Sequence, residues 1–151
     1  MITGKCLCGK VRYEINARLG PIVYCHCSMC RRATGSAFAT NASVRANEFR
    51  VVAGSELISE YESSPSNIRA FCSRCGSPLY CRWFGLFRIR FGTVDGDPGE
   101  CPVAHVWAVP RRRGTRSRTH SSSLRKRRPT GMQHRLLGID PVPMTIFEPV
   151  S

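Results

Sequence analysis

The chain has 151 residues, 42% of them hydrophobic and 22% charged, which suits a soluble protein of one domain. Its nine cysteines are too few for a disulfide scaffold. No segment reaches the roughly 18 apolar residues that cross a bilayer, and residues 1–6 lack the apolar run of a secretory signal, so we expect a cytoplasmic protein with reduced cysteines. Residues 1–110 contribute +5 and residues 111–151 contribute +8 to the net charge of +13, so a polyanionic partner would have to bind the C-terminal part.

The elements predicted for the first 108 residues are short strands separated by turns. Alternating apolar and polar residues and turn signals predict strands at residues 11–15, 49–52, 57–61, 86–92 and 104–107. In the fourth of these, Phe87, Ile89 and Phe91 share one face. The only helical signal is a turn or two at residues 28–34. We therefore expect a mainly β domain.

The composition changes abruptly at residue 109. The segment 109–151 is rich in Arg and Ser, and we predict that it is disordered because it cannot bury enough apolar surface to offset its ordering entropy. Its ten Lys/Arg residues could contact nucleic acid through phosphates, although no aromatic residues lie between them to stack on bases. A shifted reading frame would also produce this change, and the other two frames of the coding DNA test that hypothesis.

Seven of the nine cysteines form three short clusters, and two of these clusters supply four thiols. Cys6 and Cys8 have the i, i+2 spacing that places both side chains on one face of a strand. Cys72 and Cys75 are separated by two residues and followed by a glycine, as in a tight metal-binding turn. Four thiolates saturate a tetrahedral zinc ion, and a shared ion would close most of the domain. We predict a structural zinc site that contributes directly to folding.

The third cluster supplies three thiols, from Cys25, Cys27 and Cys30. Three thiolates leave one position of a tetrahedral zinc ion open for water or a substrate, and a thiol bound there would lose its proton. The alternative is a second closed site, with Cys81 or Cys101 as the fourth ligand. Without such a role these two cysteines are expected to be small buried hydrophobic residues.

Several polar residues near the third cluster are candidates for supporting roles. Arg31 and Arg32 could offset the net charge of −1 on a zinc ion with three thiolates, and Ser36 could donate a hydrogen bond near the open position. His26 lies between two predicted ligands and should point away from the metal, either as a second layer of the site or as a surface residue. His105 lies beside Trp107 and is expected to be a core histidine with its hydrogen bonds satisfied.

Three motifs, at residues 4–13, 25–38 and 71–79, resemble the glutathione-dependent formaldehyde-activating enzyme family, which also includes centromere protein V. The resemblance covers about residues 3–108, which we take as the zinc-binding domain, and leaves residues 109–151 as an atypical tail. It implies a small mainly β zinc-binding fold of several coiled antiparallel sheets, similar to methionine sulfoxide reductase type B. It assigns a structural Zn²⁺ to Cys6, Cys8, Cys72 and Cys75, and a catalytic Zn²⁺ to Cys25, Cys27 and Cys30.

The resemblance also implies an activity. Members of the family are carbon–sulfur lyases that interconvert glutathione plus formaldehyde and S-hydroxymethylglutathione, so the expected partner is a small-molecule thiol such as glutathione. The family does not fix this substrate, because one fold hosts different functions. The alternative is a zinc-stabilised, non-catalytic binding module whose basic tail contacts nucleic acid, for which centromere protein V is a precedent. A degenerate member that only binds zinc is a third hypothesis.

Overall fold

The structure, a computed structural model, describes residues 1–108, and the predictions of disorder and nucleic-acid contact for residues 109–151 lie outside the described residues. Three strands form a small antiparallel sheet in the order β1 (Ile2–Lys5), β2 (Arg12–Ile15) and β5 (Phe49–Ala53). Seven strands form a larger sheet in the order β10 (Ala104–Val106), β3 (Ile22–Cys25), β4 (Ala39–Arg45), β9 (Leu86–Arg90), β8 (Pro78–Trp83), β7 (Asn67–Cys72) and β6 (Ile58–Ser64). Neighbouring strands of this sheet are antiparallel except β10 and β3, which are parallel.

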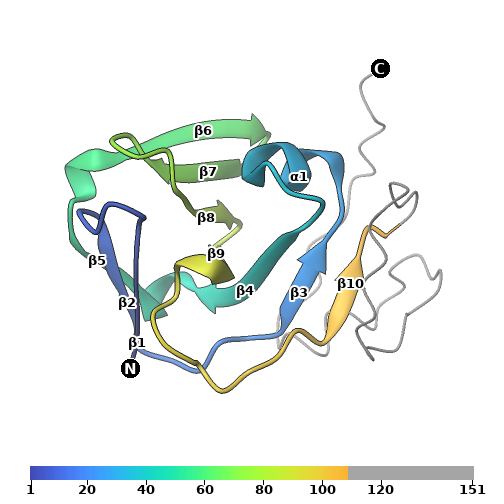
Figure 1. The fold of residues 1–151 in the computed structure, drawn as a ribbon, viewed down its shortest axis with the longest axis horizontal. Helices are drawn as coiled ribbons and strands as arrows, with labels where there is room; N and C mark the ends of the chain where they lie inside the picture. The colour runs from blue at the N-terminus through green and yellow to red at the C-terminus, as the bar shows by residue number, and fades with distance from the viewer. Residues whose placement is uncertain (109–151) are drawn as a thin grey trace.

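The predicted mainly β fold is confirmed. Within residues 1–108, the one α-helix, α1 (Ser28–Thr34), lies beside the part of the larger sheet formed by β3 and β4 (Figure 1). The five predicted strands appear as β2, β5, β6, β9 and β10. The strand predicted at residues 86–92 ends at Arg90 because the chain turns into a short 3₁₀ helix (Phe91–Thr93). Two further 3₁₀ helices span Ala46–Glu48 and Ser55–Leu57. No helix within residues 1–108 is long and apolar enough to cross a membrane.

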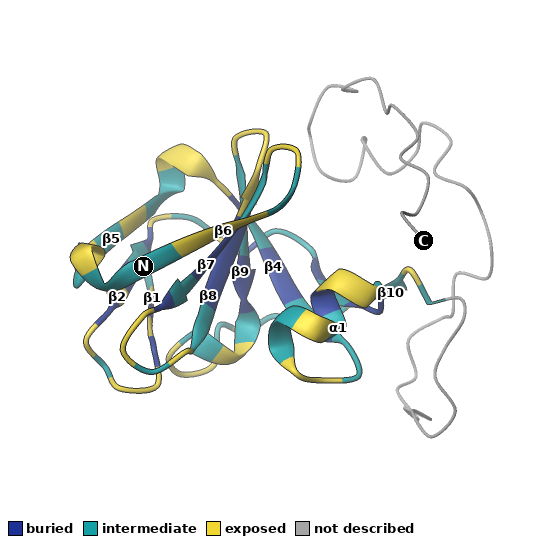
Figure 2. Ribbon diagram, turned by 90° about the horizontal axis from the view of Figure 1, so that it is seen from above, coloured by how far each residue is buried: buried dark blue, intermediate teal, exposed yellow. Residues whose placement is uncertain are grey.

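The core lies between the two sheets. Figure 2 shows buried residues concentrated on the central strands β4, β8 and β9, with exposed residues along β6 and the turns. The ring of Phe49, from the small sheet, stacks on Phe87 of the larger sheet at 4.7 Å and lies 5.1 Å from Tyr80, centroid to centroid. Each such aromatic pair contributes about 0.5–1.5 kcal/mol beyond the burial of its area. Cys6 and Cys72 belong to the same core cluster, so the core extends to the first predicted metal site.

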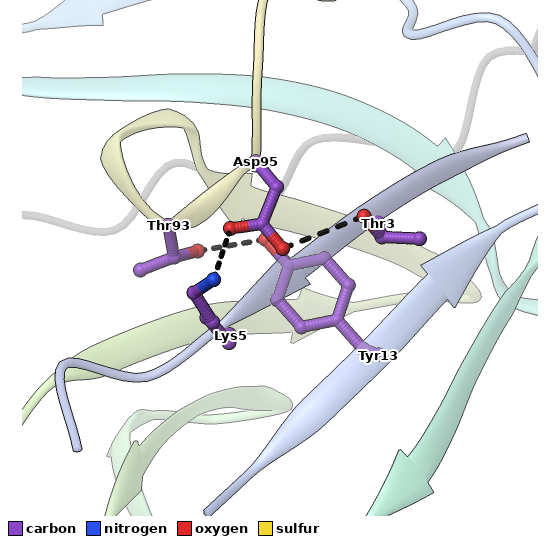
Figure 3. Close-up of polar contacts among 5 residues, drawn as sticks. All are labelled: Thr3, Lys5, Tyr13, Thr93 and Asp95. Carbon is purple, nitrogen blue, oxygen red and sulfur yellow. Dashed lines mark hydrogen bonds and ion pairs between the residues drawn. The ribbon is translucent and has the colours of Figure 1, made fainter. Parts of the chain in front are cut away.

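A polar network holds the strand before Cys6 against the segment that follows β9 (Figure 3). Lys5 Nζ lies 3.2 Å from Asp95 Oδ1, and the Thr3 hydroxyl donates to Asp95 Oδ2 at 3.4 Å. The Asp95 amide donates to the Thr3 carbonyl at 2.8 Å, and the hydroxyls of Tyr13 and Thr93 lie 2.7 Å apart. The start of the first cysteine turn is therefore fixed to a segment about 90 residues further along the chain.

Gly4 lies in this network, where the two segments form an isolated β-bridge between Gly4 and Val94. A Cβ at this position would collide with the buried ring of Tyr13 and would come within 2.6 Å of the Thr93 carbonyl oxygen. Because neither atom can move freely, we expect Gly4→Ala to lower the free energy of unfolding by about 2 kcal/mol or more. The thermal midpoint measures this loss. The matched control is Gly92→Ala, where a Cβ meets nothing within 4 Å; equal midpoints for the two variants would contradict the expectation.

Candidate metal centres

The first candidate centre joins two turns that are far apart in the sequence. Cys6 follows β1 and Cys72 ends β7, and both are buried. The Sγ atoms of Cys6, Cys8, Cys72 and Cys75 all lie within 4.8 Å of one another, with 3.4 Å between Cys6 and Cys8 and 3.9 Å between Cys8 and Cys72. Zn–S bonds of about 2.3 Å in a tetrahedron require sulfurs roughly 3.8 Å apart. The four thiols therefore fit a single tetrahedral metal ion.

Both turns of this centre have the same backbone geometry. Gly9 and Gly76 each have φ of +71°, and each donates its amide to the carbonyl of the first cysteine of its cluster, Cys6 at 2.9 Å and Cys72 at 2.8 Å. A left-handed glycine closes each turn without steric cost, so that the thiols converge. Backbone hydrogen bonds from Ser77 and Cys8 lower the pKa of Cys75 to about 6. This turn therefore favours the thiolate form that a metal requires.

The second candidate centre is formed where β3 meets α1. Cys25 ends β3, Cys27 is the N-cap residue of α1, and Cys30 lies in the first helical turn. Their three Sγ atoms lie within 4.8 Å of one another, and Cys27 Sγ accepts a hydrogen bond from the Cys30 amide at 3.3 Å. Cys25 and Cys30 are buried, whereas Cys27 is half-buried. The cluster is therefore approached from solvent on the Cys27 side.

Electrostatics distinguish the three thiols of this centre. Interactions with Cys25 and Cys27 lower the pKa of Cys30 far below its ordinary value, and the charges of Arg90 and Arg69 lower it further. Interactions with Cys27 and Cys30, together with burial, raise the pKa of Cys25. The electrostatics of the cluster therefore favour the thiolate form of Cys30, and they involve two arginines that the sequence pattern did not single out.

No fourth ligand completes the second centre from within residues 1–108. No other His, Cys, Asp or Glu ligand atom of this part of the chain lies within 4.8 Å of all three thiols. Cys81 is buried as expected, but its Sγ donates to Asn67 Oδ1 at 3.2 Å. Cys101 is exposed, so the expectation that it would be buried is wrong. The Ser36 hydroxyl donates to the Phe38 carbonyl at 2.8 Å.

A pair of histidines, His26 and His105, joins the loop of the second centre to β10. His26 is buried, so its assignment as a surface residue is wrong. Its Nε2 lies 2.8 Å from Nδ1 of His105, and its amide donates to the Val106 carbonyl at 3.0 Å. His105 also packs on Tyr24 at 4.9 Å between ring centroids. The pair joins β10 to the loop that carries Cys25 and Cys27, and parallel pairing of β10 with β3 is the long-range contact that creates it.

The sequence profile of the glutathione-dependent formaldehyde-activating enzymes matches residues 1–109. The chain belongs to this family. A relative of the formaldehyde-activating family from Halomonas elongata, provisionally named a glutathione-dependent formaldehyde-activating enzyme, is 35% identical over an alignment of 107 residues, and the match covers 64% of this chain and 68% of the relative. A crystal structure of a Rhodobacter sphaeroides protein is 27% identical, with a TM-score of 0.53, and the match covers 66% of this chain and 97% of that one. The resemblance predicted from the three motifs is thereby confirmed.

Proposed function

We propose that this chain is a zinc-dependent carbon–sulfur lyase that acts on thiol adducts of aldehydes, with glutathione and formaldehyde as the substrates that the family name suggests. The observation that carries this proposal is the second centre, where three converging thiols have no fourth partner within residues 1–108. A fold that needed metal only for stability would require no such incomplete ligand set, because four protein ligands make the closed structural site.

In this proposal, the two centres have different tasks. Cys6, Cys8, Cys72 and Cys75 hold a structural Zn²⁺ that joins β1 to β7. Cys25, Cys27 and Cys30 hold a catalytic Zn²⁺, which supplies a Lewis-acid position that binds a thiol and favours its thiolate. Both centres lie within residues 3–108, the proposed catalytic domain, and residues 109–151 are proposed to be a separate tail. The reduced thiols are suited to the cytoplasm.

The chain's own residues prepare the site for the reaction. The overall change adds the thiol S–H across the C=O bond of formaldehyde: a C–S bond forms, the π electrons pass to oxygen, and oxygen gains the proton. Cys27 is half-buried, so a small thiol reaches the cluster from its side, whereas Cys25 and Cys30 are buried. The His26–His105 contact holds the Cys25–Cys27 loop against β10.

Exchange NMR of a mixture of formaldehyde, glutathione and their adduct tests the proposed activity. We expect the full chain with its metal to accelerate exchange in proportion to protein concentration, and the chelator-treated chain to lose this acceleration. If the metal-loaded chain gives the same exchange rate as buffer, the proposed substrates are wrong. Such a result, combined with salt-sensitive DNA binding that is lost on deletion of residues 109–151, would favour the non-catalytic binding module.

A further inference from the structure

Two arginines are buried in the larger sheet and form no ion pair within residues 1–108. Arg69 on β7 is 9% exposed, and Arg90 on β9 is 5% exposed. Within residues 1–108, Arg69 Nη1 and Arg90 Nε are buried without a hydrogen-bond partner. The ion pairs that the structure describes use other basic residues, namely Lys5, Arg18, Arg45, Arg50 and Arg82. Burying an unpaired charge is costly, so two such residues on one sheet point to a ligand that offsets them.

The strand register places Arg90 on the same face of the sheet as the second centre. Cys25 lies opposite Ala39 of β4, and Asn41, two residues further on and therefore on the same face, lies opposite Arg90. Arg90 Nη1 donates to Asn41 Oδ1, and Asn41 Nδ2 donates to the Ala39 carbonyl at 3.3 Å. Arg90 is thus held by the strand that pairs with Cys25.

Arg69 shares this face from two strands further along the sheet. It lies opposite Cys81 of β8, which lies opposite Arg88 of β9, and Arg88 and Arg90 are two residues apart on one strand. The two arginines therefore form a cationic flank on the face of the sheet that carries Cys25.

The sum of charges indicates what this flank is suited to bind. Three thiolates and one Zn²⁺ carry a net charge of −1, and Arg69 and Arg90 bring the local sum to +1. Neutral water or a neutral thiol at the open position leaves this buried excess in place, whereas a thiolate removes it. Desolvated charges interact more strongly than charges in water, so a thiolate should bind at the open position more tightly than a neutral ligand.

We propose that Arg69 and Arg90 make the open position of the second centre select an anionic ligand, so that the thiol substrate binds as its thiolate. This inference deepens the proposed function and rests on the metal site that it assigns to Cys25, Cys27 and Cys30. The two arginines are positioning residues: they set the charge of the site and form no bond to the reacting atoms.

Ligand titrations of the full chain loaded with Co²⁺, followed by its absorption spectrum at one fixed pH, test the inference. The probes are 2-mercaptoethanol, which binds as a thiolate, and imidazole, which binds as a neutral ligand. We expect Arg90→Gln and Arg69→Gln each to weaken mercaptoethanol binding roughly tenfold while imidazole binding changes by less than about twofold. Arg90→Lys, which keeps the charge, should retain the wild-type preference.

The matched control is Arg88→Gln, on the same strand and face as Arg90, where the side chain is half-buried and packs over Trp83. It should leave both affinities unchanged. Equal weakening of both probes in the Arg90 and Arg69 variants would show a merely structural role and overturn the inference, as would no change in either. If the Gln variants do not fold, wild-type protein decides: it should bind azide more tightly than imidazole, and the reverse order overturns the inference.

Failure of this inference and failure of the proposed function give different results. Binding is read without turnover, so a chain that selects thiolate but does not accelerate formaldehyde–glutathione exchange would refute the substrates and keep the role of the arginines. If the chain accelerates exchange but its arginine variants keep the wild-type ligand preference, the proposed substrates stand and the role of the arginines is refuted. If the wild-type chain binds Co²⁺ at the first centre but not at the second, as its metal content would show, both the inference and the proposed function are overturned.

Discussion

Cys72→Ser is expected to leave the domain largely unfolded at 37 °C and to remove the metal of the first centre. Cys72 is fully buried, belongs to the core cluster and lies 64 residues from Cys8, to which its thiol is adjacent. Loss of one of four thiolates removes most of a binding free energy that amounts to about 10–16 kcal/mol in small zinc domains. That is as large as the total stability of about 5–15 kcal/mol typical of a domain. Circular dichroism at 37 °C, with metal analysis, measures the outcome.

The control for this variant is Cys81→Ser, which places the same substitution at another buried cysteine on the adjacent strand. Cys81 lies outside both centres, and its thiol donates to Asn67 Oδ1, a bond that a serine hydroxyl can replace. We expect a loss of only about 1 kcal/mol, with metal content unchanged. If Cys72→Ser melts at the same temperature as Cys81→Ser, the four-thiol cluster is not what stabilises the fold.

Cys27→Ser is expected to have the opposite signature: a folded protein with the second centre disabled. Cys27 is the N-cap of α1, where its Sγ accepts a hydrogen bond from the Cys30 amide. Serine is among the best N-cap residues, so the helix should start at the same place. The half-buried site tolerates the smaller side chain, but the ligand set falls from three thiolates to two. We expect one metal ion to be lost and the formaldehyde–glutathione exchange rate to fall by at least about 100-fold.

Cys101→Ser is the control for Cys27→Ser, since it removes an exposed thiol that belongs to neither centre. It should retain the wild-type exchange rate, metal content and thermal midpoint. Retention of wild-type exchange by Cys27→Ser would show that the reaction does not use the second centre. Unfolding of Cys27→Ser would show that the second centre is as structural as the first.

The cysteine clusters could be predicted because the geometry within each of them is local. The Cys-x-Cys and Cys-x-x-Cys spacings, with Gly9 and Gly76 at positive φ, set the positions of the thiols within each turn. Each cluster therefore carries its signal in a few neighbouring residues. Two clusters supply two thiols each and one cluster supplies three, which gives the predicted groups of four and three. The structure places the thiols in those two groups.

Several strands could not be predicted because both of their faces are covered. Along β4, Ala39, Asn41, Ala42 and Val44 are all buried, so polar and apolar residues do not alternate. In β8, Leu79, Tyr80 and Cys81 are buried in succession. The pattern of alternation that identifies a half-buried strand is absent from such segments.

The same burial concealed the arginines and the histidine pair. Arg90 alternates with apolar Ile89 and Phe91, so its position is typical of a solvent-facing residue, yet the second face of the larger sheet is also covered. The contact of His26 with His105 joins residues 79 positions apart through a parallel strand pair. Neither feature has a local signal, because each depends on which strands become neighbours.

The central claim is that one metal centre is closed by four thiolates and the other is open with three. Zinc content and X-ray absorption of the purified full-length chain test it directly. We predict two zinc ions per chain, a mean of about 3.5 sulfur ligands per zinc with a lighter atom completing the shell, and a rise of the mean to about 4 on addition of 2-mercaptoethanol. A single zinc ion per chain, or a mean of four sulfurs before any thiol is added, would contradict the account.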